Sequence, residues 1–361
     1  MNARIITDLA AWPVDIPLRD NFTISSGTLT RVENVFLRVT LADGSHGYGE
    51  SAPFPGVTGE TRKGTLAAID SLRGLIVGHG ADQWNTLAAS MHEALPHAPA
   101  ARCGIETAIL DALCRSLGVP LWKYLGGTDQ SPYETDITIP ILGYERSLEL
   151  AEQWHARGFR VFKLKVGLDL DTDLRIIDTL AHRHSDASFV LDANEGFDQE
   201  SATSLMSWLD GHQINVRLIE QPLRRDDLEG MAHLRRTSRL PLAADESVMS
   251  VAQSKRVIEA KAADAINIKI MKLGVAEALR IAEMARTAGV GLMFGGMVET
   301  RLAMGCSLCL ASTGAIHTLD LDTPLLMTED PVAGGFRYDG PRMFMSSEAG
   351  HGGTPRATRD S

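Results

Sequence analysis

The sequence has few cysteines, no long apolar run and no excess of positive charge. Four cysteines in 361 residues are too few for a disulfide framework, which favours a reducing compartment. No run approaches the roughly 20 apolar residues that a membrane helix needs. The first eight residues lack the apolar stretch of a signal peptide. We therefore expect a cytoplasmic protein that is not inserted in a membrane.

The charge balance is acidic. Lysine and arginine together number 35 against 46 aspartates and glutamates, which gives a formal net charge of −11. Because no block of basic residues stands out against this background, a nucleic-acid surface is excluded and a small-molecule partner is favoured. Apolar residues make up 44% of the chain, which is enough for a sizeable core and for more than one domain.

The second part of the chain alternates between strand-like and helical segments, with strands recurring about every 25 residues. The predicted strands are 136–142, 161–166, 189–194, 217–222, 242–247, 265–270, 290–296 and 317–322. Eight β/α units close a TIM-like (β/α) barrel, in which the active site lies at the C-terminal ends of the strands. The alternative, an open doubly wound sheet, would concentrate the chemistry at one switch point.

Residues 1–127 have a different texture, in which three strand-like segments precede two helical ones. This order predicts an α+β domain that caps the barrel. Two of its loops, 21–31 and 53–61, are rich in glycine, serine, threonine and proline, and we expect them to cover a site. The barrel is predicted at 128–325. A C-terminal segment, 326–361, is expected to return to the capping domain and to end in a loosely ordered polar tail from residue 346.

Three neighbouring predicted strands end in a carboxylate, namely Asp192, Glu220 and Asp245. Adjacent strand ends bring such groups close to one point, where a hard divalent cation relieves their repulsion. Mg²⁺ prefers oxygen ligands, and Mn²⁺ is a possible substitute. Zn²⁺ is less suited, because no histidine or cysteine accompanies the three. We expect Asn194 and Glu246 to orient these ligands. The alternative is three separate salt bridges at the barrel rim.

Lysines flank these carboxylates. Lys163 and Lys165 are two residues apart on one strand and therefore face the same side, where each is expected to lower the pKa of the other. Lys269 lies four strands further round the ring from Lys165 and would approach a substrate from the opposite face. Two bases on opposite faces imply inversion at a carbon. The matching reaction removes a proton next to a carboxylate, and a cation stabilises the resulting enediolate.

Taken together, these motifs resemble the signature of the enolase superfamily, in its muconate-lactonizing subgroup, over nearly the whole chain. The motifs are Lys163-Leu164-Lys165, Asp192-Ala193-Asn194, Glu220-Gln221-Pro222, Asp245-Glu246 and Lys269. The resemblance implies that the three carboxylates bind Mg²⁺. It also implies that Lys165 and Lys269 are the acid/base pair, with Lys163 as an electrostatic helper.

The last predicted strand resembles that of dipeptide epimerases, in which an Asp-x-Asp pair holds the α-ammonium group of the substrate. Here the pair is Asp320 and Asp322. The alternative is two solvated acidic residues at a strand end. The segment 295–300, which includes Met297, also resembles dipeptide epimerases and is expected to line the pocket.

The first capping loop predicts which side chain is preferred at the second residue of the dipeptide. Relatives that act on Ala-Glu place an arginine there, and this chain has none at the matching position; Arg19 and Arg31 only flank the loop. The residues that would contact the second side chain of the substrate are apolar, namely Phe22, Ile24, Phe54 and Val57. We therefore expect a neutral, hydrophobic second residue.

The sequence thus predicts a Mg²⁺-dependent dipeptide epimerase that inverts the α-carbon of the C-terminal residue by a 1,1-proton transfer. The resemblance also implies a homo-oligomer. One alternative is another reaction of the subgroup: o-succinylbenzoate synthesis, N-succinylamino acid racemisation or cycloisomerisation. Another is a non-catalytic, metal-dependent binder of peptides or carboxylates.

Overall fold

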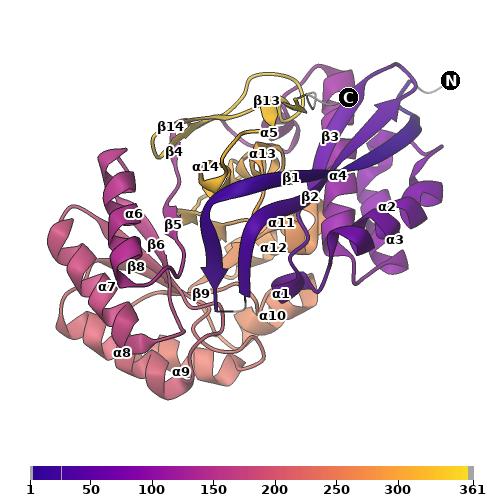
Figure 1. The fold of residues 1–361 in the computed structure, drawn as a ribbon. Helices are drawn as coiled ribbons and strands as arrows, with labels where there is room; N and C mark the ends of the chain where they lie inside the picture. Colours follow the sequence, from indigo (N-terminus) through magenta and orange to yellow (C-terminus); the bar gives the residue numbers. More distant parts are fainter. Residues whose placement is uncertain (1–2, 26, 357–361) are drawn as a thin grey trace.

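A three-stranded antiparallel sheet packed on helices forms the N-terminal part of the protein (Figure 1). The computed structural model describes residues 3–25 and 27–356. The elements of this part are β1 (Ile6–Ile24), β2 (Gly27–Leu41), β3 (His46–Ser51), α1 (Pro55–Thr58), α2 (Arg62–Ile76), a 3₁₀ turn (Ala81–Gln83), α3 (Trp84–Ala94), α4 (Pro99–Leu117) and α5 (Leu121–Tyr124).

Helix α4 lies directly against β3. A Cβ atom at Gly47 would come within 2.0 Å of the Ala112 backbone nitrogen, and one at Gly49 within 2.1 Å of the Gly104 carbonyl oxygen. Only glycine at these two strand positions lets the strand and the helix approach so closely. The side chains of α4 are buried from Pro99 to Cys114, since the helix also contacts the barrel through α11.

The second part is a barrel of eight parallel strands in sequential order, as predicted. Its strands are β5 (Ile137–Ile139), β6 (Val161–Lys165), β7 (Ser188–Asp192), β8 (Val216–Glu220), β9 (Leu242–Ala244), β10 (Ala265–Ile268), β11 (Gly291–Phe294) and β12 (Thr318–Leu319). The first and last strands meet without a ladder, through the hydrogen bond from the Asp136 backbone N–H to the Leu319 carbonyl oxygen at 3.0 Å.

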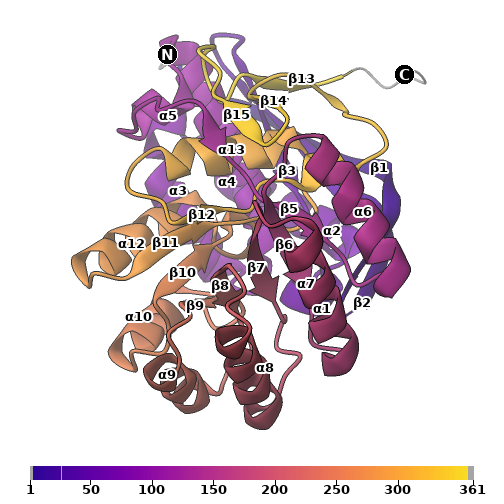
Figure 2. The ribbon, with the colours of Figure 1, turned by 90° about the vertical axis from the view of Figure 1, so that its left-hand side faces the viewer.

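Helices cover the outside of the strands (Figure 2). They are α6 (Tyr144–Ala156), α7 (Leu170–Arg183), α8 (Gln199–Gly211), α9 (Leu228–Thr237), α10 (Val251–Glu259), α12 (Val275–Thr287) and α13 (Arg301–Ala311). Two short helices follow β10 and β12, namely α11 (Ile270–Leu273), which contacts α4, and α14 (Thr323–Leu326), which contacts β1. Within the described residues, none of the helices is both long and apolar enough to cross a bilayer.

Inside the barrel, an apolar layer lies beneath the charged strand ends. Its members form a core cluster of their own, made of Val161, Val190, Leu218, Ala243, Ala265 and Met293. Val161 is two residues before Lys163, and Val190 is two before Asp192, so each pair shares the interior face of its strand. These apolar side chains therefore fill much of the barrel beneath the layer of charged strand ends.

The segment 21–31, predicted as a loop, is instead the end of a β-hairpin, so the loop assignment was wrong. β1 continues to Ile24 and β2 begins at Gly27, with Phe22 paired opposite Leu29. Strand pairing wins here because the alternate residues Phe22 and Ile24 are buried, which the period of two in a strand permits. Figure 1 shows the hairpin reaching from the N-terminal sheet across the barrel.

The C-terminal segment packs back on the rest of the chain. It contributes β13 (Val332–Gly334), β14 (Arg337–Asp339), β15 (Arg342–Phe344) and β16 (Gly353–Pro355), and β15 also pairs with β4 (Tyr133–Glu134).

The expected loose tail from residue 346 was wrong as far as Arg356. His351 is buried, its N–H donates to Asp111 Oδ1 at 2.9 Å and its ring lies 2.9 Å from the Tyr48 carbonyl oxygen. These contacts order the segment against the capping part. The rest of that expected tail, residues 357–361, lies outside the described residues.

Candidate active site

Lys163 lies at the centre of the charged layer. Its Nζ is 2.9 Å from Asp192 Oδ2, 2.8 Å from Glu220 Oε2 and 2.6 Å from Asp320 Oδ2. The Lys163 side chain is 1% exposed. β6 aims the lysine inward, and β7 and β8 aim the two ligand candidates at the same point. The structure therefore brings three of the predicted site residues together around the ammonium group of a fourth, Lys163.

Lys165 lies two residues after Lys163 on β6 and closer to the β1–β2 hairpin. Its Nζ is 2.6 Å from Asp192 Oδ2, and it donates to Asn194 Oδ1 at 3.2 Å. The Phe22 ring lies over this ammonium group, with 5.9 Å between the nitrogen and the ring centroid. Ser25, near the tip of the hairpin, donates to the Asn194 carbonyl oxygen at 2.6 Å. The hairpin is thus fastened to the same strand end that the lysine contacts.

Lys269 approaches from the other side of the barrel. Its Nζ is 2.7 Å from Asp245 Oδ2. The second oxygen of Asp245 forms a short ion pair with Lys272, whose ammonium group also donates to the Asp245 carbonyl oxygen at 2.7 Å. Lys272 was not predicted. The signal that could have indicated it is the close spacing Lys269-x-x-Lys272, in which the second lysine lies in the short helix α11 that begins directly after Lys269.

Two side-chain amides brace the strand ends that carry the carboxylates, and neither amide was predicted. Asn267, which shares the inward face of β10 with Lys269, donates to Glu220 Oε1 at 2.6 Å. Gln221 accepts the Asp245 backbone N–H at 3.0 Å. Gln221 has a φ of 37°, which a non-glycine residue adopts only when its surroundings impose it. Backbone strain therefore accompanies the strand end that carries Glu220.

The two predicted orienting residues do lie beside the ligand candidates. Asn194 Nδ2 donates to Glu246 Oε1 at 3.0 Å, and the Asn194 backbone N–H donates to Asp192 Oδ1 at 3.0 Å. Asn194 also has a positive φ of 42°. Glu246 Oε2 is buried with no hydrogen-bond partner in the described part of the chain. This oxygen is a spare acceptor next to the carboxylates.

The pKa values of the three carboxylates shift in different directions. Burial raises the pKa of Asp192, but the neighbouring ammonium groups, led by Lys163, lower it by more. Burial likewise raises the pKa of Asp245, and Lys269 and the lysine beside it bring that pKa well below its usual range. For Glu220, burial and the charge of Asp192 raise the pKa to about 7.

The expected mutual lowering of the lysine pKa values is wrong for Lys163. Burial lowers the pKa of this lysine, but the carboxylates around it, led by Asp192, raise it well above the ordinary value. Burial also lowers the pKa of Lys269, but the nearby carboxylates, led by Asp245, raise it by more. Attraction to buried carboxylates outweighs repulsion between ammonium groups because the opposite charges lie in direct contact.

A second acidic group lies on the other side of Lys163. Oxygens of Asp136, Asp320 and Asp322 all come within 4.8 Å of one another. Asp322 Oδ2 accepts the Thr138 backbone N–H at 2.5 Å. Asp320 and Asp322 are 5% and 0% exposed, which excludes two solvated acids at a strand end. Asp136 was not predicted.

The predicted apolar contacts lie above the charged layer. Phe22, Ile24, Phe54 and Met297 are buried in the main core, and Val57 is half-buried against it. The hairpin supplies the first two, and the short helix α1 and the residue before it supply Phe54 and Val57. These side chains come from separate segments, and each belongs to the core that surrounds the barrel.

Two known families match the chain. Residues 6–126 match the mandelate racemase / muconate lactonizing enzyme, N-terminal domain, and residues 146–359 match the enolase C-terminal domain-like family. The chain belongs to the mandelate racemase/muconate lactonizing enzyme family of the enolase superfamily. The family resemblance drawn from the sequence motifs is thereby confirmed.

Several similar proteins are epimerases. The L-Ala-D/L-amino acid epimerase of Populus trichocarpa is 40% identical over 348 residues, which cover 94% of this chain and 82% of that protein. The aromatic dipeptide epimerase of Herpetosiphon aurantiacus is 41% identical over 349 residues, or 96% of this chain and 98% of that one. The solved structure of a dipeptide epimerase from Enterococcus faecalis, complexed with Mg and L-Leu-L-Tyr, aligns at a TM-score of 0.93 with 30% identity, covering 97% and 99% of the two chains.

The donor set in this enolase-superfamily barrel fits a hard divalent cation. Asp192, Glu220 and Asp245 offer only oxygen ligands, and they come from three successive strands. Each is at most 2% exposed. All three are now paired with lysine ammonium groups, so the layer already accommodates positive charge among its carboxylates. A divalent cation therefore has suitable ligands at this layer.

Proposed function

We propose that this protein is a magnesium-dependent dipeptide epimerase that inverts the α-carbon of the C-terminal residue of a dipeptide. Its epimerase relatives support the reaction class. The observation that carries the proposal is the placement of two lysines. Lys165 and Lys269 come from β6 and β10, four strands apart in the ring of eight, and each contacts a different carboxylate.

This placement suits proton transfer on two faces of one carbon. One lysine removes the α-proton, and the other returns a proton to the opposite face. The lysine that acts as the base must first be neutral. Lys163, held among Asp192, Glu220 and Asp320, stays charged and helps to balance the negative charge that develops on the substrate carboxylate.

We assign Asp192, Glu220 and Asp245 as the ligands of Mg²⁺, with Asn194 and Glu246 orienting them. When bound, the cation supplies further positive charge for the substrate carboxylate, and Mn²⁺ has the same ligand preference. The bound Mg of the Enterococcus faecalis structure supports this cofactor. Lys272 and Asn267 restrain Asp245 and Glu220 from behind.

We assign the α-ammonium group of the dipeptide to Asp320 and Asp322. Their burial beside a single lysine leaves negative charge that a substrate cation can balance. An N-succinylated amino acid would bring a neutral amide and a further carboxylate to the same place. The acidic pair therefore argues against N-succinylamino acid racemisation and o-succinylbenzoate synthesis.

The second residue of the dipeptide is proposed to be neutral and hydrophobic. Phe22, Ile24, Phe54, Val57 and Met297 supply apolar surface above the charged layer. The two nearby arginines are engaged elsewhere, because Arg19 Nε donates to the Leu325 carbonyl oxygen at 3.2 Å and Arg31 is paired with Asp15 at 2.9 Å. The aromatic dipeptide preference in the name of the Herpetosiphon aurantiacus relative agrees with this assignment.

The test is deuterium uptake from D₂O by a mixed library of L,L-dipeptides in the presence of Mg²⁺, followed by mass spectrometry. We expect uptake of one deuterium, confined to dipeptides with apolar C-terminal residues. The double variant Lys165→Ala/Lys269→Ala serves as the control and should abolish it, because it lacks a base on either face of the α-carbon. Absence of uptake by every dipeptide, with the metal bound, would contradict the proposal. A best substrate of Ala-Glu would contradict only the hydrophobic preference.

We further propose that the enzyme is a homo-oligomer of the cytoplasm. The family resemblance supports the first point, and four buried cysteines carried as free thiols support the second. Light scattering coupled to gel filtration tests the assembly. A monomer at micromolar concentration would contradict it.

A further inference from the structure

Asp136 is a buried carboxylate without a partner. It stands immediately before β5 and is 2% exposed. Both of its oxygens lack a hydrogen-bond partner within the described residues. Burying a carboxylate without a cation or a hydrogen-bond donor costs free energy of folding, so a partner for this group is expected in the functional state.

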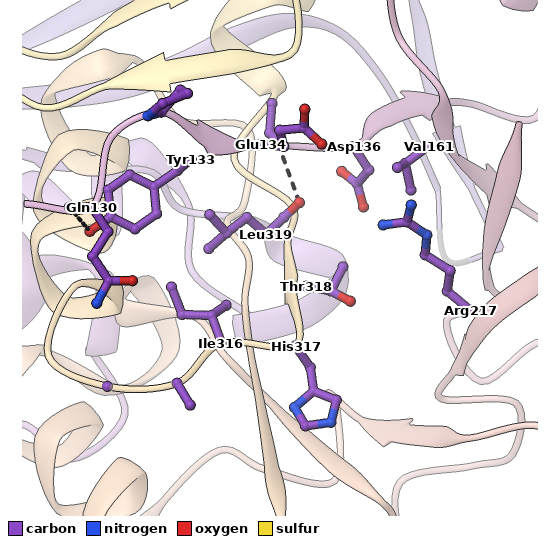
Figure 3. A pocket seen from close by; sticks show the side chains of 14 residues that line it. Gln130, Tyr133, Glu134, Asp136, Val161, Arg217, Ile316, His317, Thr318 and Leu319 are labelled. Carbon is purple, nitrogen blue, oxygen red and sulfur yellow. Dashed lines mark hydrogen bonds between the residues drawn. The ribbon is translucent and has the colours of Figure 1, made fainter.

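The cavity on one side of Asp136 contains a cationic side chain, but this side chain forms no ion pair with Asp136 within the described residues. A cavity of about 630 Å³ lies at the N-terminal ends of the strands, and its lining includes Glu134, Asp136, Arg217 and His317. Figure 3 shows the carboxylate of Asp136 and the guanidinium of Arg217 on the same side of this cavity. Arg217 is exposed, and no ion pair joins it to Asp136 in the described part of the chain.

On the other side, Asp136 belongs to the acidic cluster with Asp320 and Asp322, whose oxygens lie within 4.8 Å of one another. Asp322 Oδ1 is buried and also lacks a partner. The ammonium group nearest to the cluster is that of Lys163, and Asp192 and Glu220 share it. The three carboxylates of the cluster therefore have only one nearby ammonium group, and they share it with two other carboxylates.

The direction of the pKa shifts agrees with this shortage. Burial, followed by the charges of Asp320 and Asp322, raises the pKa of Asp136 well above the ordinary value. Burial and the charge of Asp320 raise the pKa of Asp322 to about 7. Carboxylates that share a small volume without a cation repel one another in this way. A cation placed at the orphan oxygens relieves the repulsion.

We propose that Asp136 is a specificity-determining residue of the ammonium subsite, where it makes the pocket select a free α-ammonium group over a neutral N terminus. This role rests on the proposed function and deepens it. Asp320 and Asp322 contact the ammonium group, whose positive charge favours the ionised form of Asp136 beneath them, so that Asp136 adds negative charge to the subsite. Its place on the first strand, below Thr138 on the same interior face, gives it that position.

The test compares L-Ala-L-Phe with N-propionyl-L-Phe, which differs only by replacement of the ammonium group with hydrogen. Both are measured as substrates by deuterium exchange, and the analogue is also measured as a competitive inhibitor. Asp136→Asn keeps the size of the side chain and removes the charge. We expect the KM for L-Ala-L-Phe to rise roughly 10- to 100-fold, as for loss of one charge–charge attraction in a buried, partly screened site. The kcat and the inhibition constant of the analogue should change less than about threefold.

Stability and a matched variant separate this role from a structural one. Removing an unpartnered buried charge should leave the unfolding midpoint of Asp136→Asn unchanged or higher. Asp173→Asn, which alters a buried carboxylate that accepts the Gly167 N–H, should leave the selectivity unchanged. Asp136→Ser is a smaller second variant in case the first does not fold.

Three outcomes would count against the proposal. An unchanged ratio of kcat/KM for L-Ala-L-Phe to that for the analogue, in a native-like Asp136→Asn protein, would assign Asp136 to the N-terminal cavity instead. Loss of one bound Mg²⁺ per chain in the variant would make the cluster a metal site. Absence of turnover in the native protein would overturn the proposed epimerase function itself, so the two failures are distinguishable.

Discussion

Replacing Lys272 with methionine tests whether this unpredicted lysine holds Asp245 in place. The substitution keeps an unbranched apolar side chain and removes the ammonium group. Lys272 is 1% exposed, and its Nζ contacts both a carboxylate oxygen and the carbonyl oxygen of Asp245. Without it, Asp245 Oδ1 loses its ammonium partner, and the Asp245 carbonyl oxygen keeps only the hydrogen bond from the Val248 backbone N–H at 2.9 Å.

The magnitude follows from the carboxylate contact. A buried acceptor left unsatisfied costs about 1–3 kcal/mol, and more when it is charged, so the variant should lose about 2–5 kcal/mol of unfolding free energy. A value of about 3–5 kcal/mol for breaking a buried ion pair is consistent with this range. A less restrained Asp245 should also weaken Mg²⁺ binding or activity about 10- to 100-fold.

The assay is urea unfolding of Lys272→Met and the native protein in EDTA, followed by Mg²⁺ titration and deuterium exchange. Lys255→Met is the control, because Lys255 forms an exposed pair with Glu259 at 3.6 Å. Such pairs contribute about 0.5 kcal/mol or less. If Lys272→Met lies within about 0.5 kcal/mol of the native protein and keeps its activity, the reasoning about Asp245 is refuted.

The remaining predictions concern catalysis, specificity and pH. Lys165→Ala and Lys269→Ala should each lower the kcat of epimerisation by about 10²- to 10⁴-fold or more, measured by optical rotation. Phe22→Ala should lower kcat/KM for L-Ala-L-Phe by roughly tenfold relative to L-Ala-L-Ala, since one apolar contact is worth about 1–3 kcal/mol. Burial raises the pKa of Asp173 from 3.8 to about 6, so the folded state holds its proton more tightly than the unfolded state. The stability that this group contributes is therefore present below pH 3.8 and lost as the pH rises to about 6. Asp173→Asn should remove this pH dependence, which is measured as the free energy of unfolding across that window.

Each of these has a clear contrary result. Full epimerisation by either lysine variant would remove that residue from the acid/base pair. Equal losses for both dipeptides in Phe22→Ala would indicate a structural role for the ring. A stability difference between Asp173→Asn and the native protein that does not vary between pH 3.8 and about 6 would contradict the raised pKa.

The charged layer could be predicted from sequence because its geometry is local. Side chains alternate along a strand, so Lys163 and Lys165 had to share a face. Parallel strands end at one edge, so Asp192, Glu220 and Asp245 had to meet there. The strand ends themselves were predicted too long, since the backbone turns out of the ladder at the site residues, as the positive φ of 42° at Asn194 illustrates.

Tertiary structure alone decided what surrounds that layer. Asp136 precedes the first strand and looked unremarkable in the sequence, and only closure of β5 against β12 puts it beneath Asp320 and Asp322. The hairpin likewise required Leu29 as a partner for Phe22, and pairing across a turn is not encoded by either segment alone.

The sequence by itself determined which side chains point into the barrel, because the strand period fixes direction. It did not determine their charge states. Direct contact with Asp192 holds the pKa of Lys163 high, whereas repulsion between neighbouring lysines alone would have lowered it. Burial and distance set that balance, and both arise only when segments far apart in the chain are packed together.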